Sequence, residues 1–252
     1  MKKNRVRELI KQGKSTLGAW IGTNSSDIVE ILAHLDFDWF VFDTEHGPLN
    51  AEMVQTLMQA MNGSDVVPMM RVAWNDPVLI KKALDIGAYG LVIPWVNSKE
   101  QAIAAVQACR YPPLGIRGSG PRRAAQYGFD PDYRVMADEE IMVIPQIEHI
   151  DAVNHIDEIF AVEGIDAYLI GPSDLSFSMG KRGQWNDPEV QQAIDRVFEA
   201  GKRAGVAGGI YAFSYDMAKA CLARGFQFIS IGSDTSFLIR GAREALSTIR
   251  PK

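Results

Sequence analysis

The chain has 252 residues, 47% of them hydrophobic, and a formal net charge of −5, which is an ordinary globular composition. The acidic balance offers no basic field for nucleic-acid phosphates, and no apolar run approaches the roughly 18 residues that span a bilayer. Only two cysteines occur, Cys109 and Cys221, which excludes a disulfide framework and favours a reducing, cytoplasmic location. The amino terminus is charged, so we expect no signal peptide.

Short apolar runs alternate along the chain with longer stretches of helical period. The runs predict strands at 17–22, 38–43, 66–72, 89–94, 141–147, 166–171, 206–211 and 226–231. The stretches between them predict helices at 26–34, 51–62, 76–86, 98–109, 151–160, 187–204, 214–224 and 234–248. Nearly continuous apolar strands are typical of parallel sheets covered on both faces. About eight β/α units in a chain of this length predict a single-domain (β/α)8 TIM barrel over residues 1–252.

An open, doubly wound sheet is the alternative fold. It would carry a glycine-rich phosphate turn after its first strand, and residues 22–26 do not form one. One irregular stretch, 111–138, is rich in proline, glycine and arginine. Structureless segments of that length are uncommon inside compact domains and usually functional.

Charged side chains follow the predicted strands at the rim where barrel enzymes place their chemistry. Glu148 and Asp174 end neighbouring strands, and two adjacent carboxylates repel unless a cation lies between them. Oxygen ligands without cysteine favour a divalent ion such as Mg²⁺, Mn²⁺ or Co²⁺. The alternative is that these residues are helix caps or surface acids, Asp174 in particular.

Two further rim residues are candidates for proton transfer and anion binding. His46 lies in a polar loop after a strand, and imidazole is the side chain best suited to proton transfer near neutral pH. Asp43 or Asp85 could orient it, and a structural role is the alternative. Arg71 at a strand end suits a carboxylate or an enolate, the alternative being a salt bridge to Glu45 or Asp43.

Other rim features are weaker signals. The turn at 171–174 opens a short helix whose free N–H groups favour an anion. Trp20, Trp95 and Phe213 are candidates for a pocket wall, with core or rim packing as the alternative. No lysine lies within an apolar strand, so carbonyl chemistry here would use a metal rather than a Schiff base.

Taken together, several ordered motifs resemble the HpcH/HpaI aldolase family of class II, metal-dependent pyruvate aldolases, from about residue 15 to 240. They are FDTEHGP, VVPMMR, NDPVLIKKALDIGAYGLVIPWVNS, GIRGSGPRRA, IPQIEH and IGPSDLS. The resemblance implies that Glu148 and Asp174 are metal ligands, that His46 is the catalytic base with Asp85 as its paired acid, and that Arg71 stabilises the pyruvate enolate. It also implies that the pyruvate carboxylate binds at the turn formed by Gly171, Pro172, Ser173 and Asp174, with Gln146 beside it.

The resemblance further implies a homohexamer with a C-terminal helix exchanged between subunits. Thr44, His149 and the pair Arg122–Arg123 depart from the family pattern, which leaves the aldehyde half of the substrate open. We therefore expect reversible cleavage of a 4-hydroxy-2-oxo acid to pyruvate and an aldehyde. A citrate-lyase-like acyl-CoA lyase, using Arg117, Arg122 and Arg123 for the CoA phosphates, and a catalytically silent binding barrel are the alternatives.

Overall fold

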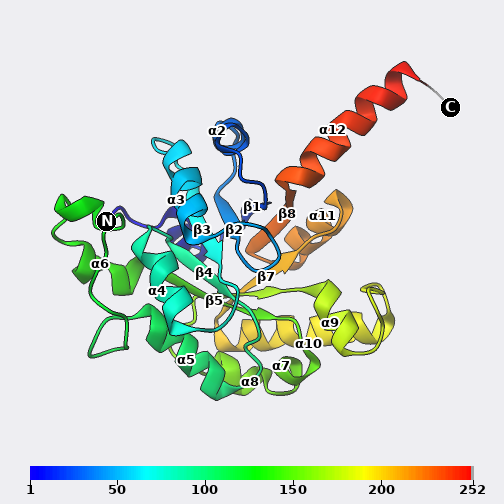
Figure 1. Ribbon diagram of the computed structural model, residues 1–252. Helices are drawn as coiled ribbons and strands as arrows, with labels where there is room; N and C mark the ends of the chain where they lie inside the picture. The colour runs from blue at the N-terminus through cyan, green and yellow to red at the C-terminus, as the bar shows by residue number, and fades with distance from the viewer. Residues whose placement is uncertain (251–252) are drawn as a thin grey trace.

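Eight parallel strands close into one barrel in their order along the chain (Figure 1). This closed order, in a computed structural model that describes residues 1–250, confirms the predicted (β/α)8 barrel rather than an open sheet. The strands are β1 (Thr16–Ile21), β2 (Trp39–Asp43), β3 (Val67–Arg71), β4 (Gly90–Ile93), β5 (Met142–Ile147), β6 (Ala167–Ile170), β7 (Ala207–Tyr211) and β8 (Phe228–Ser233).

The helices match the predicted ones with three differences. They are α1 (Arg5–Lys11), α2 (Ser26–Ala33), α3 (Ala51–Ala60), α4 (Pro77–Asp85), α5 (Lys99–Cys109), α6 (Tyr133–Glu140), α7 (Ile150–Asn154), α8 (Ile156–Phe160), α9 (Pro172–Ser178), α10 (Pro188–Ala204), α11 (Tyr215–Arg224) and α12 (Asp234–Ile249). The predicted helix at 151–160 is divided at His155 into α7 and α8. The 111–138 segment, for which no helix was predicted, contains a 3₁₀ turn at Gln126–Gly128 and the start of α6. Helix α1 was not predicted either.

Local sequence explains where the helices begin and end. The side chains of Asp76 and Ser98 accept hydrogen bonds from backbone N–H groups in the first turns of α4 and α5. Gly205 and Gly225 end α10 and α11 in the left-handed conformation, which costs glycine little.

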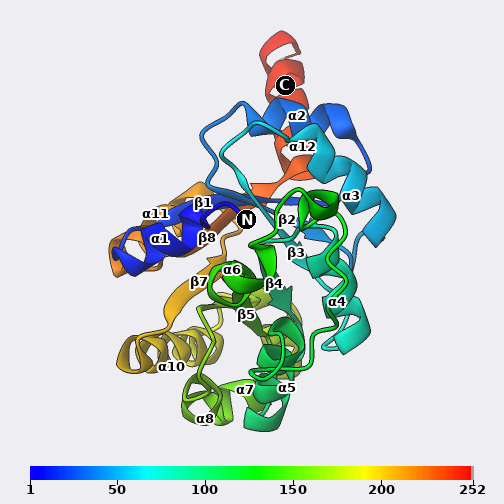
Figure 2. The ribbon, with the colours of Figure 1, turned by 90° about the vertical axis from the view of Figure 1, so that its left-hand side faces the viewer.

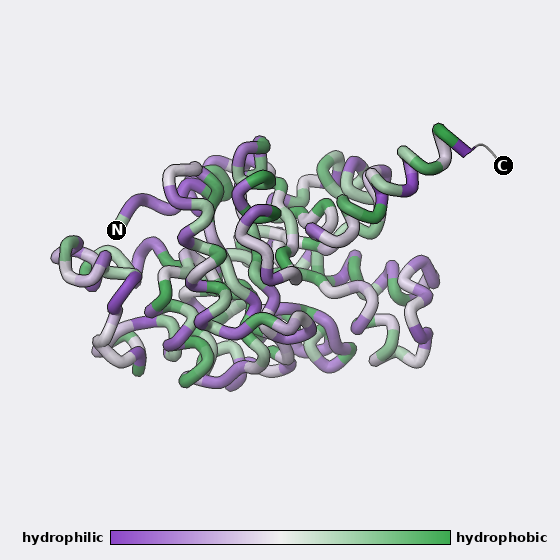
Figure 3. The backbone as a smooth tube through the Cα atoms, turned by 45° about the horizontal axis from the view of Figure 1, so that its top comes forward, coloured by the Kyte–Doolittle hydropathy of each residue, from purple (hydrophilic) through white to green (hydrophobic). Residues whose placement is uncertain are grey.

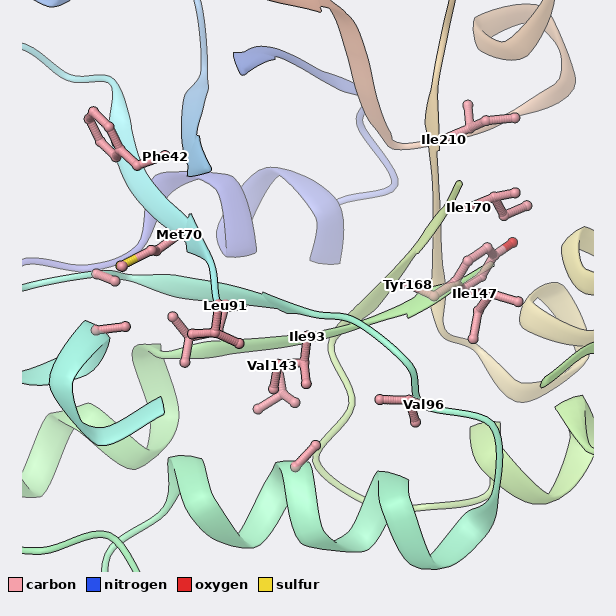
Figure 4. Packing of buried hydrophobic residues seen from close by; sticks show 14 of the residues in the cluster. Phe42, Met70, Leu91, Ile93, Val96, Val143, Ile147, Tyr168, Ile170 and Ile210 are labelled. Atoms are coloured by element: carbon pink, nitrogen blue, oxygen red, sulfur yellow. The ribbon is translucent and has the colours of Figure 1, made fainter. Parts of the chain in front are cut away.

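The barrel separates two hydrophobic layers. Side chains such as Trp39, Met69 and Phe228 fill its interior, while alternate residues of the same strands pack outward against the helices. Figure 4 shows part of the outer layer around Leu91, Ile93 and Val143. Every strand is therefore covered on both faces, which is why the strands read as continuous apolar runs.

Helix α1 lies at the amino-terminal end of the barrel, beside β1 and β8 (Figure 2). Its Val6 and Ile10 are buried against the interior cluster. The side chain of Asn4, the N-cap, donates hydrogen bonds to the carbonyl oxygens of Tyr89 (3.0 Å) and Glu140 (2.9 Å). This end of the barrel is thus closed by packing, and the opposite end is left for a site.

Helix α12 extends away from the barrel (Figures 1 and 3). Asp234, at its start, is its only buried residue, although the helix carries exposed apolar side chains at Leu238, Ile239, Leu246 and Ile249. Within residues 1–250, no helix has the length and apolarity to cross a membrane.

Candidate active site

The carboxyl ends of the strands surround a cavity of about 490 Å³. Polar residues predicted from the sequence line it: His46, Arg71, Gln146 and Asp174. Its remaining lining residues are Trp20, Gly22, Asp43, Gly47, Pro48, Leu169, Pro172, Ser173, Tyr211, Phe213, Ser233, Asp234 and Thr235. The barrel therefore brings together side chains that lie more than a hundred residues apart in sequence.

Arg71 is held in a fixed orientation by two carboxylates. Asp43 pairs with Arg71 in the β2–β3 register and accepts two hydrogen bonds from its guanidinium, from Nε at 3.0 Å and from Nη2 at 2.7 Å. Nη1 of Arg71 lies 3.0 Å from Oε2 of Glu45, and the guanidinium lies over the ring of Trp20 at 4.4 Å. The salt bridges considered as an alternative are thus present. They leave guanidinium N–H groups that can still bind a ligand oxygen.

Hydrogen bonds to the carboxylate of Asp43 hold the loop after β2 in place. Oδ1 of Asp43 accepts hydrogen bonds from the backbone N–H groups of Glu45 (3.0 Å) and His46 (3.3 Å). A Cβ at Gly47 would lie 2.6 Å from the carbonyl oxygen of Asp43, so the tight loop requires glycine there. This loop presents His46 at the cavity with its side chain 65% exposed and Nε2 4.0 Å from Glu45 Oε1.

Glu148 follows β5 and is buried. Its Oε1 accepts a hydrogen bond from the backbone N–H of Trp95 at 3.1 Å, and its Oε2 accepts one from Nε2 of Gln146. Burial, with the negative charges of Glu45 and Asp174, raises the pKa of Glu148 to about 7, and the hydrogen bonds from Trp95 and Gln146 oppose this rise. Burial likewise raises the pKa of Glu45, partly opposed by Arg71.

The backbone of Trp95 is strained where it meets Glu148. Its φ is +57°, a conformation that is rare for a bulky residue and that turns its N–H toward the carboxylate. The side chain is 41% exposed and lies beside the rings of Trp74 and His149, each at 5.7 Å between centroids. Trp95 therefore holds Glu148 through its backbone and contributes to the rim through its indole.

Asp174 lies in the first turn of α9, after Gly171 ends the β6 segment. A Cβ at Gly171 would lie 3.3 Å from Gln146 Nε2 and 3.5 Å from Glu148 Oε2, so this turn passes close to the buried carboxylate. Like all helix starts, the first turn of α9 has backbone N–H groups without an acceptor in the helix.

The chemistry of these donors fits a divalent cation. Glu148 and Asp174 repel each other, and Oε1 of Gln146 is buried without a hydrogen-bond partner. A cation would offset both penalties. Among residues 1–250 no group of three or more His, Cys, Asp or Glu side chains is arranged to hold a metal, so this chain would supply two carboxylates and leave other positions open.

Asp85 does not join the cavity within this chain. It is the last residue of α4, which starts after the carboxyl end of β3 and runs back toward the amino-terminal end of the barrel. There its Oδ1 accepts a hydrogen bond from Nη2 of the buried Arg117 at 3.1 Å. The pairing of His46 with Asp85 that the resemblance implied is therefore not made inside one chain, because the length of α4 separates them.

The sequence predicted most of the rim but missed one contribution. Trp20 and Phe213 line the cavity as considered, whereas Trp95 is not among the lining residues. The salt bridge from Arg71 to Asp43, considered as an alternative, is present because both residues end neighbouring strands. The hydrogen bond from the Trp95 backbone to Glu148 was not predicted, because it depends on one φ angle.

A family model described as HpcH/HpaI aldolase/citrate lyase matches residues 16–241. The chain belongs to the HpcH/HpaI aldolase/citrate lyase family. It is 42% identical over 97% of its length to the 4-hydroxy-2-oxo-heptane-1,7-dioate aldolase of Klebsiella pneumoniae subsp. pneumoniae, of which it covers 92%. It is 41% identical to the enzyme of that name from Shigella sonnei, with 97% of this chain and 94% of that one aligned.

Solved structures of the family have the same barrel. The HpcH/HpaI aldolase/citrate lyase family protein of Burkholderia cenocepacia J2315 superposes with a TM-score of 0.95 at 34% identity, over 98% of this chain and 100% of that one. The HpcH/HpaI aldolase of Desulfitobacterium hafniense DCB-2 gives 0.91 at 31% identity, over 98% and 96%. The expected family is confirmed, and the protein is a carbon–carbon lyase of the aldolase type.

Proposed function

We propose that this enzyme reversibly cleaves a 4-hydroxy-2-oxo acid into pyruvate and an aldehyde, with a divalent cation held by Glu148 and Asp174. The observation that carries the proposal is the buried Glu148 carboxylate, fixed by Gln146 and Trp95 and close to the charge of Asp174. Mg²⁺, Mn²⁺ or Co²⁺ suits these oxygen donors. When bound, the cation acts as a Lewis acid that withdraws charge from the carbonyl.

The chain's own residues supply binding and proton transfer. Backbone N–H groups of the turn at Gly171–Asp174, including that of Ser173 after Pro172, would bind the pyruvate carboxylate beside Gln146. Arg71, already oriented by Asp43 and Glu45, would direct a remaining N–H to the C2 oxygen as negative charge develops there.

His46 would remove the proton from the C4 hydroxyl during cleavage and return it during condensation. Its exposed position at the cavity suits a group that exchanges protons with substrate and solvent. Asp85 would assist it only from a second copy of the chain, because the two residues lie at opposite ends of one barrel. That role for Asp85 stays a prediction.

The expected homohexamer with an exchanged C-terminal helix is also part of the proposal. The exposed apolar side chains of α12, which its own barrel does not cover, support contact with a second copy. The cytoplasmic location stays a prediction, to which the buried, free thiols of Cys109 and Cys221 are suited.

The acyl-CoA alternative has less support. Arg117, one candidate for a CoA phosphate, is buried and donates a hydrogen bond to Asp85. Arg123 donates to the carbonyl oxygen of Ile86, the residue that follows α4, at 2.7 Å. Both lie at the end of the barrel opposite the cavity. The solved citrate lyase of Burkholderia xenovorans LB400 and the citrate lyase beta subunit of Mycobacterium tuberculosis are 17% and 13% identical to this chain and share the fold alone.

The test measures retro-aldol turnover together with Mn²⁺ binding by calorimetry. We expect His46→Ala to lower turnover at least about 100-fold while keeping Mn²⁺ affinity, and Asp174→Ala to lose both. His34→Ala, at the end of α2 and outside the cavity, is the matched control. Full turnover in excess EDTA would contradict the metal-dependent scheme.

A further inference from the structure

One wall of the cavity is a continuous series of aromatic rings. Trp20 and Tyr211 lie 6.1 Å apart between centroids, Tyr211 and Phe213 5.3 Å, and Phe213 and Trp185 5.2 Å. Trp20, Tyr211 and Phe213 line the cavity, and Trp185 extends the series outward from the loop after α9. We call these four residues the aromatic wall.

The wall ends at the reacting centre. Trp20, its innermost member, stacks on the guanidinium of Arg71 and is 7% exposed. Its indole N–H has no hydrogen-bond partner among residues 1–250. Phe213, farther out, is 40% exposed and so offers ring surface to a bound molecule. A ligand attached at Arg71 would therefore meet aromatic faces as it extends outward.

Within residues 1–250 of one chain, the cavity offers no unpaired cation to a second carboxylate on that ligand. In the described part of this chain, Arg71 is the only lysine or arginine in the lining, and two carboxylates already neutralise it. The other charged lining residues are the acids Asp43, Asp174 and Asp234. Desolvating another anion here would be costly without a cation to pair with it.

We propose that the aldehyde partner carries an aromatic ring, which lies against the aromatic wall. This inference rests on the proposed aldol reaction. Aromatic rings prefer tilted or offset contacts at centroid distances of roughly 4.5–7 Å. The rings of the aromatic wall already have this spacing, and the ring of a ligand would extend the series by one.

The reaction with such a partner balances without a further reagent. Pyruvate loses one proton from C3, the resulting carbanion forms a bond to the aldehyde carbon, and the carbonyl π electrons become an alkoxide that takes up one proton. The product is a 4-aryl-4-hydroxy-2-oxo acid. This differs from the relatives, whose name specifies a heptane-1,7-dioate with a carboxylate at each end.

The experiment compares kcat/KM for pyruvate condensation with benzaldehyde and with 4-oxobutanoate, an aldehyde that ends in a carboxylate. We expect benzaldehyde to be favoured at least tenfold, and Phe213→Ala to reduce that ratio at least tenfold. Phe129→Ala is the matched control, because Phe129 is 87% exposed and borders a different cavity at the amino-terminal end. It should leave the ratio unchanged.

A second measurement does not depend on turnover. Benzyl alcohol, which cannot react, should bind to the EDTA-treated protein in calorimetry, and Phe213→Ala should weaken this binding. Preference for 4-oxobutanoate, or equal binding of benzyl alcohol to both proteins, would overturn the inference. Absence of metal-dependent deuterium exchange at C3 of pyruvate would instead overturn the proposed function, so the two failures are distinguishable.

Discussion

The strained backbone at Trp95 orients its N–H toward the carboxylate of Glu148. At φ +57° its N–H donates to Glu148 at 3.1 Å; such strain costs about 1–3 kcal/mol and persists only where the surrounding structure maintains it. Glycine adopts this conformation freely, whereas a β-branched residue resists it. The backbone, more than the indole, therefore positions Glu148.

Two substitutions at this position separate backbone from side chain. We expect Trp95→Val to weaken Mn²⁺ binding about tenfold more than Trp95→Gly, since a conformational cost of roughly 1.4 kcal/mol corresponds to a factor of ten. Calorimetric titration of both variants measures the difference. Equal affinities would show that the N–H of residue 95 has no part in holding Glu148.

The raised pKa of Glu148 gives the metal-free protein a specific pH dependence. Its folded-state pKa of about 7 lies above the ordinary value of 4.5, so the folded state binds the proton more tightly than the unfolded state. The stability from this group is complete below pH 4.5 and is lost as the pH rises to 7. At 1.36 kcal/mol per pKa unit, the loss is on the order of 3 kcal/mol.

Glu148→Gln removes this titration. In urea unfolding with EDTA, we expect the parent to lose stability relative to Glu148→Gln as the pH rises from 4.5 to 7. The difference should then level off. Parallel stability curves for the two proteins across this range would contradict the buried, charged state assigned to Glu148.

At the scale of elements, α1 closes one end of the barrel and so decides which end holds the site. Ile10 is buried against the interior cluster, whereas Lys11 beside it is exposed. We expect Ile10→Ala to lower the free energy of unfolding by about 2 kcal/mol, because it leaves a cavity that the rigid strands cannot fill. Lys11→Ala is the control and should change stability by less than about 0.5 kcal/mol. Equal effects in denaturant unfolding would mean that α1 does not seal the barrel.

At the scale of the whole molecule, α12 leaves apolar surface without a partner. Leu238 and Leu246 are 66% and 57% exposed, although leucine is ordinarily buried. If a second copy covers this helix, Leu238→Glu combined with Leu246→Glu should dissociate the assembly, as sedimentation velocity would show. Glu244→Gln, on the same helix, serves as the control and should leave the assembly intact. A monomeric parent, or an assembly that survives the double substitution, would refute the exchange of α12.

The sequence by itself determined the barrel, because parallel strands buried on both faces leave continuous apolar runs and each capped helix carries its own start and stop residues. It also determined the rim positions of His46, Arg71 and Glu148, since barrel chemistry follows strand ends. The sequence did not predict α1, because its few apolar residues, Val6 and Ile10, are buried only by packing against the barrel interior.

Only the tertiary structure decided how these residues meet. Arg71 is fixed by Asp43 and Glu45, and Glu148 by a backbone N–H from the loop after the neighbouring strand β4, through distances and one φ angle that no local pattern encodes. It also separated Asp85 from His46, because a helix of nine residues runs from one end of the barrel to the other. Local sequence fixes each element, whereas closure of the sheet decides which ends come together.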